Sequence, residues 1–137
     1  MSAGFTIRNA FYQAMLVDVA RRAPEEACGL VVGQSGVVTQ VYQVTNALRS
    51  RSRYRMDSQE QVDAFLAMEK NNQELLAIYH SHPAGPHAPS QTDLAEHAYP
   101  GVITLIWFPV GASWACRAYK IDEGRADEIS LDLVDDM

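Results

Sequence analysis

The sequence predicts an α+β fold in which a mixed β-sheet is flanked by helices, within a single domain spanning residues 1–137. Three observations support this prediction. Strand-like apolar segments outnumber helical ones, several neighbouring segments are joined by tight turns, and no linker, repeat or low-complexity tract interrupts the chain. With 47% apolar residues in a chain of 137, there is enough apolar surface for the core of one domain.

The N-terminal third of the chain combines helical and strand-like periodicity. Phe11, Met15 and Val19 recur at helical spacing and predict a helix. Asn9 is its expected N-cap, and Pro24 ends it. A continuous apolar run then predicts a buried strand, and a Gln-Ser-Gly turn leads into the next one. In order, the expected elements are a strand over 4–8, a helix over 10–22 and strands over 28–32 and 37–44.

The remainder of the chain predicts a second amphipathic helix followed by strands around a proline-rich loop. Asp57 or Ser58 is the expected N-cap, Ser58 with Gln61 resembles a capping box, and Val62 and Phe65 belong to the expected apolar face. In order, the expected elements are a short strand over 53–56, a helix to about residue 71, a strand over 75–79, a loop over 84–89, a short helix begun by Ser90, and strands over 102–108, 113–121 and 128–134.

Charge and cysteine content exclude several classes of function. A formal net charge of −6 argues against binding nucleic acid, whose phosphate backbone requires clustered Lys and Arg. Cys28 and Cys116 lie in apolar stretches without a Cys-x-x-Cys pattern, so we expect buried, reduced thiols rather than metal ligands. No basic leader precedes an apolar run, and no membrane span is visible. We therefore expect a cytoplasmic protein.

Two histidines stand where a buried apolar strand ends. His80 and His82 are two residues apart, so on a strand both imidazoles point to one face and can reach one ion. Catalytic zinc sites combine three protein ligands, such as neutral imidazoles and carboxylates, with one open position. Asp93 is the expected third ligand, because it lies in the first turn of the helix begun by Ser90, where the helix dipole favours a carboxylate.

Other interpretations of these residues stay open at this point. His97, one turn after Asp93, and His87, in the proline-rich loop, are rival third ligands. A lone His-x-His pair is weak evidence for a metal. The segment from Ser90 to Asp93 could also be a capping arrangement at the start of the helix, which does not exclude metal ligation.

The spacing of the whole set resembles the signature of the JAMM (MPN+) family of zinc metalloproteases, in its small prokaryotic form. His80-Ser81-His82-Pro83, six residues, Ser90, two residues and Asp93 match His-x-His-Pro-x6-Ser-x2-Asp without a gap or substitution. The upstream Pro-x-Glu-x-Cys-Gly context of the family is present at residues 24–29. Asn46, the segment 54–57 and the helix after it also look like the small bacterial members, so the resemblance covers essentially the whole chain.

Glu25 and Glu26 are told apart by the alternation of a strand. Glu26 and Cys28 would share one face, whereas Glu25 points to the other. The family pattern selects Glu26 as the residue that faces the metal. Glu25 is then expected to be a solvated carboxylate.

The resemblance implies an MPN-type α/β/α sandwich, like that of cytidine deaminases, with one zinc ion per chain. It implies that the metal ligands are His80, His82 and Asp93, and that the catalytic residues are Glu26 and Ser90. In the family's chemistry, zinc activates a water, Glu26 takes its proton and delivers it to the leaving amine, and Ser90 donates a hydrogen bond to the oxyanion.

The resemblance also implies a substrate, namely an amide bond after the C-terminal Gly-Gly of a ubiquitin-like or sulfur-carrier protein. A glycine tail can approach the enzyme backbone closely, and an exposed strand edge could pair with it. Two alternatives stay open. One is a peptidase that acts on cell-wall or phage-tail peptides, and the other is a metal-free MPN interaction scaffold, against which the complete ligand set argues.

Four arginines alternate along residues 49–55 and would share one side if this segment is extended. One interpretation is a solvated, charged edge that resists aggregation. The other is a basic strip that receives an acidic face of the carrier. In that case, charge reversal at Arg51 and Arg53 weakens carrier binding.

Overall fold

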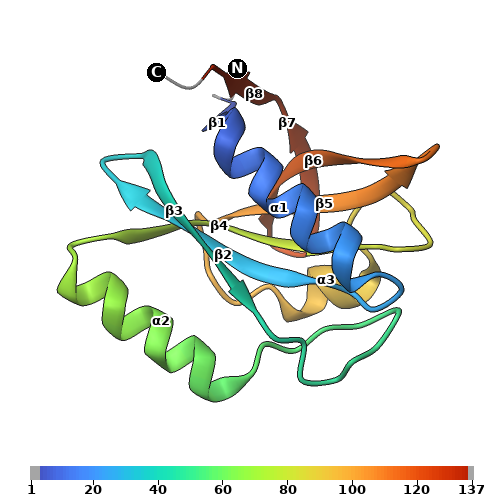
Figure 1. The fold of residues 1–137 in the computed structure, drawn as a ribbon, viewed down its shortest axis with the longest axis horizontal. Coiled ribbons are helices and arrows are strands. Elements are labelled where there is room, and N and C mark those ends of the chain that lie inside the picture. Colours follow the sequence, from blue (N-terminus) through green and yellow to red (C-terminus); the bar gives the residue numbers. More distant parts are fainter. Residues whose placement is uncertain (1–3, 136–137) are drawn as a thin grey trace.

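The order of elements along the chain largely follows its hydrophobic periodicity. The computed structural model describes residues 4–135. In chain order the elements are β1 (Phe5–Arg8), α1 (Asn9–Arg22), β2 (Cys28–Gln34), β3 (Val37–Val44), α2 (Ser58–Lys70), β4 (Glu74–Ser81), α3 (Gln91–Glu96), β5 (Ile103–Val110), β6 (Ser113–Asp122), β7 (Arg125–Ile129) and β8 (Leu131–Val134). Figure 1 shows β4 and β5 running through the middle of the molecule.

The central sheet has six strands in the order β3-β2-β4-β5-β6-β7. Strands β4 and β5 are parallel, and the other neighbours in this sheet are antiparallel, so the sheet is mixed as predicted. Strands β1 and β8 form a separate parallel pair, which brings the two ends of the described chain side by side.

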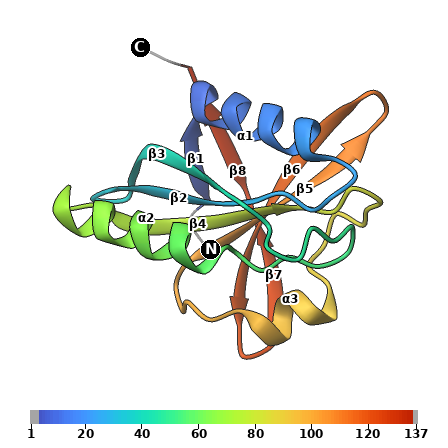
Figure 2. The same ribbon diagram turned by 60° about the horizontal axis from the view of Figure 1, so that its bottom comes forward.

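Helices cover both faces of the sheet, with α1 on one side and α2 and α3 on the other (Figure 2). Met15 and Val19 of α1 are fully buried against one face, as their spacing predicts. Helix α2 packs on the other face through Ala64 and Met68, whereas Val62, expected on its buried side, is 51% exposed. The predicted α+β fold, a sheet flanked by helices, is confirmed. No helix in residues 4–135 is long and apolar enough to cross a membrane.

A buried polar network, which the periodicity does not predict, ties α1 to the sheet. Asp18 is 1% exposed and accepts hydrogen bonds from Arg22 Nε and Nη2 at 2.9 and 2.7 Å and from the Tyr79 hydroxyl at 2.6 Å. Arg22 also donates to the carbonyl oxygens of Cys28 and Val44 at 2.8 and 2.6 Å. Because a buried charge is tolerated only when it is paired and hydrogen-bonded, these contacts fix the end of α1 over β2, β3 and β4.

Two expected strands are wrong. Residues 53–56 form only an isolated bridge between Asn46 and Met56, because backbone groups of this segment bind the Asn46 side chain instead of a neighbouring strand. The expected strand over 128–134 is divided between β7 and β8. The division falls at Ser130, because the chain leaves the edge of β6 after Ile129 and pairs with β1 from Leu131 onward.

The N-cap of α1 differs from the prediction, whereas α2 is capped by Asp57, one of the two expected residues. Asn9 is the first residue of α1, and Arg8 occupies the N-cap position without a side-chain capping bond, because β1 runs directly into the helix. Asp57 caps α2 by accepting a hydrogen bond from Glu60 N at 3.0 Å. The capping box expected to begin at Ser58 is therefore wrong.

Candidate metal centre

Both histidines lie at the C-terminal end of β4, a central strand of the sheet, with His82 one residue beyond it. The antiparallel register of β2 and β4 pairs Cys28 with His80, and just beyond it Ser81 N donates to the carbonyl oxygen of Ala27 at 3.0 Å. Glu26 and His82, the next residues on the two segments, therefore lie at the same end of the sheet. His80 points to the same face as its partner Cys28, the face that α2 covers, and the ligand atoms of Glu26 and His82 lie within 4.8 Å of that of His80. Glu26, His80 and His82 are 3%, 1% and 6% exposed, so a cluster of titratable groups lies out of bulk water.

The start of α3 brings Asp93 to the two histidines. Ser90 Oγ accepts a hydrogen bond from Asp93 N at 3.1 Å, and Asp93 Oδ2 accepts one from Ser90 N at 2.8 Å, which completes a capping box. The same Oδ2 lies 3.2 Å from His80 Nε2 and 3.0 Å from His82 Nε2. The capping arrangement therefore orients the carboxylate toward the histidines, and the two interpretations of this segment are compatible.

The three converging atoms have the spacing of ligands around one metal ion. The two Nε2 atoms are 3.2 Å apart, and Asp93 Oδ2 is 3.0–3.2 Å from each of them. Ligands at about 2.0–2.1 Å from a tetrahedral zinc ion lie about 3.3–3.4 Å from one another. A Glu26 carboxylate oxygen lies within 4.8 Å of both histidine ligand atoms. The residues present fit one divalent ion, with Glu26 beside it.

Neighbouring groups orient both imidazoles. His82 Nδ1 lies 2.8 Å from the carbonyl oxygen of Pro86, and donating to it leaves the Nε2 lone pair available for a metal. The ring of Tyr54 stacks on His80 with centroids 4.7 Å apart and an angle of 28° between the planes. The contacts of Tyr54 and Pro86 with the two imidazoles were not predicted from the sequence. No periodicity could reveal them, because each depends on how a loop folds over the end of β4.

The electrostatics of the cluster separate the two carboxylates. Burial and the charge of Asp93 raise the pKa of Glu26 to about 7, against the attraction of His82. Asp93 shows the opposite behaviour: burial opposes its ionisation, but its close contacts with the His80 and His82 rings and the hydrogen bond from Ser90 N keep its pKa well below the usual range. Burial lowers the pKa of His80, against the pull of Asp93, which favours the neutral imidazole. An ionised carboxylate near a neutral imidazole suits metal ligation, and a carboxyl with a pKa near 7 suits proton transfer.

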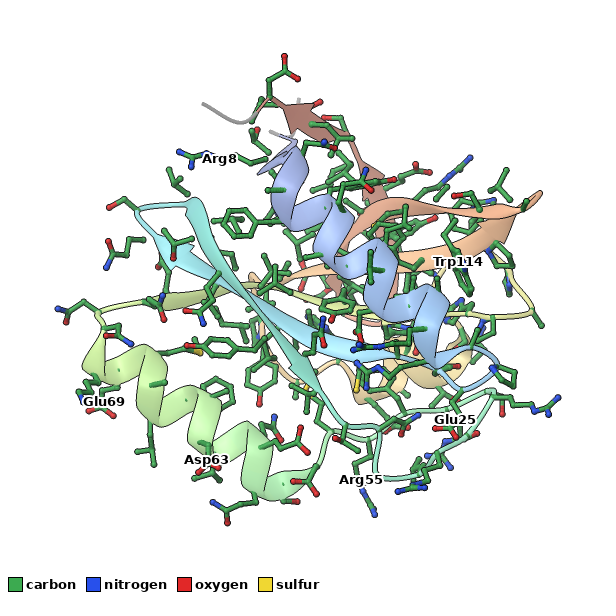
Figure 3. The ribbon with its side chains drawn as sticks, in the orientation of Figure 1. Arg8, Glu25, Arg55, Asp63, Glu69 and Trp114 are labelled. Carbon is green, nitrogen blue, oxygen red and sulfur yellow. The ribbon has the colours of Figure 1, made fainter. Side chains whose placement is uncertain are left out.

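The rival ligands lie elsewhere in the structure. His87 Nδ1 is 3.1 Å from the Tyr119 hydroxyl, and His97 follows the end of α3. Neither belongs to the set of converging atoms among the described residues. Glu25 is partly exposed, and Figure 3 shows it at the edge of the molecule.

A cavity of about 220 Å³ opens beside the cluster. It lies between α3 and the connection from β3 to α2, and its lining includes Arg53, Tyr54, His80, Asp93, His97 and Tyr99. Arg53 Nη2 and Glu96 Oε1, 3.1 Å apart, form an exposed ion pair across its rim. The cavity therefore reaches the cluster at His80 and Asp93.

The site combines two imidazoles at a strand end, a carboxylate at a helix start and a second buried carboxyl in an α/β/α sandwich. This combination is typical of hydrolytic metal centres. The chain belongs to the prokaryotic JAB family, because the family described as prokaryotic homologs of the JAB domain matches residues 8–122. This match confirms the resemblance to small prokaryotic JAMM proteins.

Curated relatives and solved structures agree with this family. The CysO-cysteine peptidase of Mycobacterium tuberculosis is 33% identical over 132 residues, covering 94% of this chain and 90% of the relative. A probable TtuB-protein conjugate cleaving protease of Thermus thermophilus is 40% identical over 112 residues, covering 81% and 70%. The solution structure of protein DSY2949 from Desulfitobacterium hafniense superimposes with a TM-score of 0.85 at 30% identity, covering 96% and 94%.

Proposed function

We propose that residues 1–137 act as a single-domain zinc-dependent peptidase, which hydrolyses the amide bond after the C-terminal Gly-Gly of a ubiquitin-like or sulfur-carrier protein. The convergence of His80 Nε2, His82 Nε2 and Asp93 Oδ2 within 3.0–3.2 Å supports this proposal most strongly. The similarity to a CysO-cysteine peptidase and to a TtuB-protein conjugate cleaving protease supports the class of substrate.

His80, His82 and Asp93 would hold one zinc ion per chain. When bound, zinc supplies Lewis-acid chemistry, which makes a water acidic enough to react near neutral pH. Glu26, buried with a carboxylate oxygen within 4.8 Å of the histidine ligand atoms, accepts the proton of the attacking water and delivers it to the amine that leaves. Ser90 Oγ accepts the hydrogen bond that caps α3, which leaves its O–H free to donate a hydrogen bond to the oxyanion of the tetrahedral intermediate.

The cytoplasm is the proposed location of this reaction. Cys28 and Cys116 are free thiols, and burial raises the pKa of Cys28 to about 12, so this thiol is unreactive. Cys28 is buried and Cys116 partly buried, and free thiols without a disulfide are typical of reducing compartments.

The proposal is tested by incubating the chain with ubiquitin-like proteins that carry a short C-terminal extension after Gly-Gly. Mass spectrometry should show a product that ends at the second glycine together with the released extension. A chelator should stop the reaction, and added zinc should restore it. Intact substrates, or cleavage at other positions, would contradict the proposal.

The four arginines of residues 49–55 are all exposed, although the segment is not a strand as first expected. We expect the double change Arg51→Glu and Arg53→Glu to weaken binding of a Gly-Gly carrier about tenfold at low salt, because exposed charge pairs contribute up to about 1 kcal/mol each. Binding is measured by titration at two salt concentrations. Arg8→Glu is the matched control, since Arg8 lies at the opposite end of the molecule from Arg55 (Figure 3). An unchanged dissociation constant at low salt would eliminate the basic strip as a docking surface.

A further inference from the structure

Asn46 is a buried amide in the connection between β3 and α2, where its neighbours in sequence are exposed. Its exposed fraction is 3%, and it forms an isolated antiparallel bridge with Met56 at the far end of the same loop. An amide side chain has two N–H donors and an oxygen that can accept two hydrogen bonds. Burying it is favourable only if these groups find partners.

The side chain of Asn46 finds four partners. Nδ2 donates to the carbonyl oxygens of Glu26 and Arg53, each at 3.0 Å. Oδ1 accepts from the backbone N–H groups of Leu48 at 3.0 Å and Arg55 at 3.2 Å. Three of these contacts close the loop that forms the rim of the cavity. The fourth reaches outside the loop to the backbone of Glu26.

Glu26 needs this contact because it precedes β2 and lies outside the paired residues of the sheet. Its N–H donates to the carbonyl oxygen of Ser50, in the same loop, at 2.8 Å, and its carbonyl accepts from Asn46. On the other side, Ala27 N donates to Ser81 Oγ at 2.8 Å. The peptide groups of Glu26 are therefore fixed by the loop, while the next residue is fixed by the strand that carries both histidines.

We propose that Asn46 is a positioning residue, which sets the placement of the Glu26 carboxylate by fixing the backbone of Glu26 to the loop at the cavity rim. This inference rests on the function proposed above, in which Glu26 is the general base. Asn46 lies outside the set of converging ligand atoms, so its effect on the reaction passes through Glu26. A displacement of about 1 Å at a reacting group can lower turnover about 10²-fold.

The test compares Asn46→Asp and Asn46→Ala with the wild-type protein. In Asn46→Asp the carboxylate can still accept from Leu48 and Arg55 but cannot donate to the carbonyl of Glu26. We expect turnover at saturating substrate to fall about 10²-fold in both variants while one metal ion per chain is retained. Asp57→Ala, which removes the N-cap of α2 near the same loop, is the matched control and should keep wild-type turnover.

A second readout does not need activity. Amide hydrogen exchange followed by NMR should show faster exchange at Glu26 N, which is bonded to Ser50, and unchanged exchange at Ser81 N, which is bonded to the Ala27 carbonyl. If the wild-type protein cleaves no carrier, the proposed function fails, and exchange alone decides the role of Asn46. Unchanged exchange at Glu26, turnover equal to that of Asp57→Ala, loss of the metal, or failure of both variants to fold would each overturn the positioning role.

Discussion

Replacing Glu26 with Gln is expected to lower turnover about 10²–10⁴-fold while the metal stays bound, because proton transfer by a positioned side chain contributes a factor of this size. The substitution keeps the shape of a side chain that is only 3% exposed, but it removes the group that accepts the proton. The raised pKa of Glu26, about 7, suits a residue that both takes and returns a proton near neutrality. Turnover of an extended carrier and metal content are measured on the same sample.

Glu25→Gln is the control for this change, since Glu25 is the preceding residue and is partly exposed. It should retain wild-type turnover. Activity that survives Glu26→Gln would exclude Glu26 as the general base. Loss of the metal in Glu26→Gln would instead indicate that Glu26 is a metal ligand. Its carboxylate oxygen lies within 4.8 Å of the histidine ligand atoms, which is close enough for that role.

Replacing Ser90 with Ala should lower turnover about 10²–10³-fold, because removal of one hydrogen-bond donor to the oxyanion typically lowers turnover by this factor. The Ser90 hydroxyl also caps α3 through Asp93 N at 3.1 Å, and loss of a cap costs only about 1 kcal/mol of stability. The two roles therefore predict different outcomes. Steady-state kinetics and thermal unfolding of Ser90→Ala and Ser90→Thr, which keeps a hydroxyl, measure both. Reduced stability with unchanged turnover would leave Ser90 only as a cap.

The features of the site that could be predicted depend on residues that are close together in the sequence. The spacing of His80 and His82 at the end of a strand predicts that their imidazoles can reach one ion, and their two Nε2 atoms lie 3.2 Å apart. Asp93 was preferred to His87 and His97 only because of the spacing of the whole set, and its role as a ligand stays a prediction. The capping box at Ser90, which orients Asp93 toward the histidines, supports that prediction.

The parts that were missed depend on contacts between distant segments. The stacking of Tyr54 on His80 and the hydrogen bond from Tyr79 to the buried Asp18 form only after distant segments have come together, so no local periodicity predicts them. The division of the last strand at Ser130 has the same cause. Residues on either side of it alternate like one strand, but they pair with β6 and with β1, which lie in different sheets.

The central claim, that two imidazoles and one carboxylate hold a single divalent ion, is tested most directly by the metal content of the purified chain. Elemental mass spectrometry of the wild-type protein and of Asp93→Ala should find about one zinc ion per wild-type chain and a large loss in the variant, because three protein ligands define such a centre. A wild-type chain that binds no metal after incubation with zinc would indicate an interaction scaffold. Equal zinc content in the two proteins would exclude Asp93 as a ligand and contradict the account.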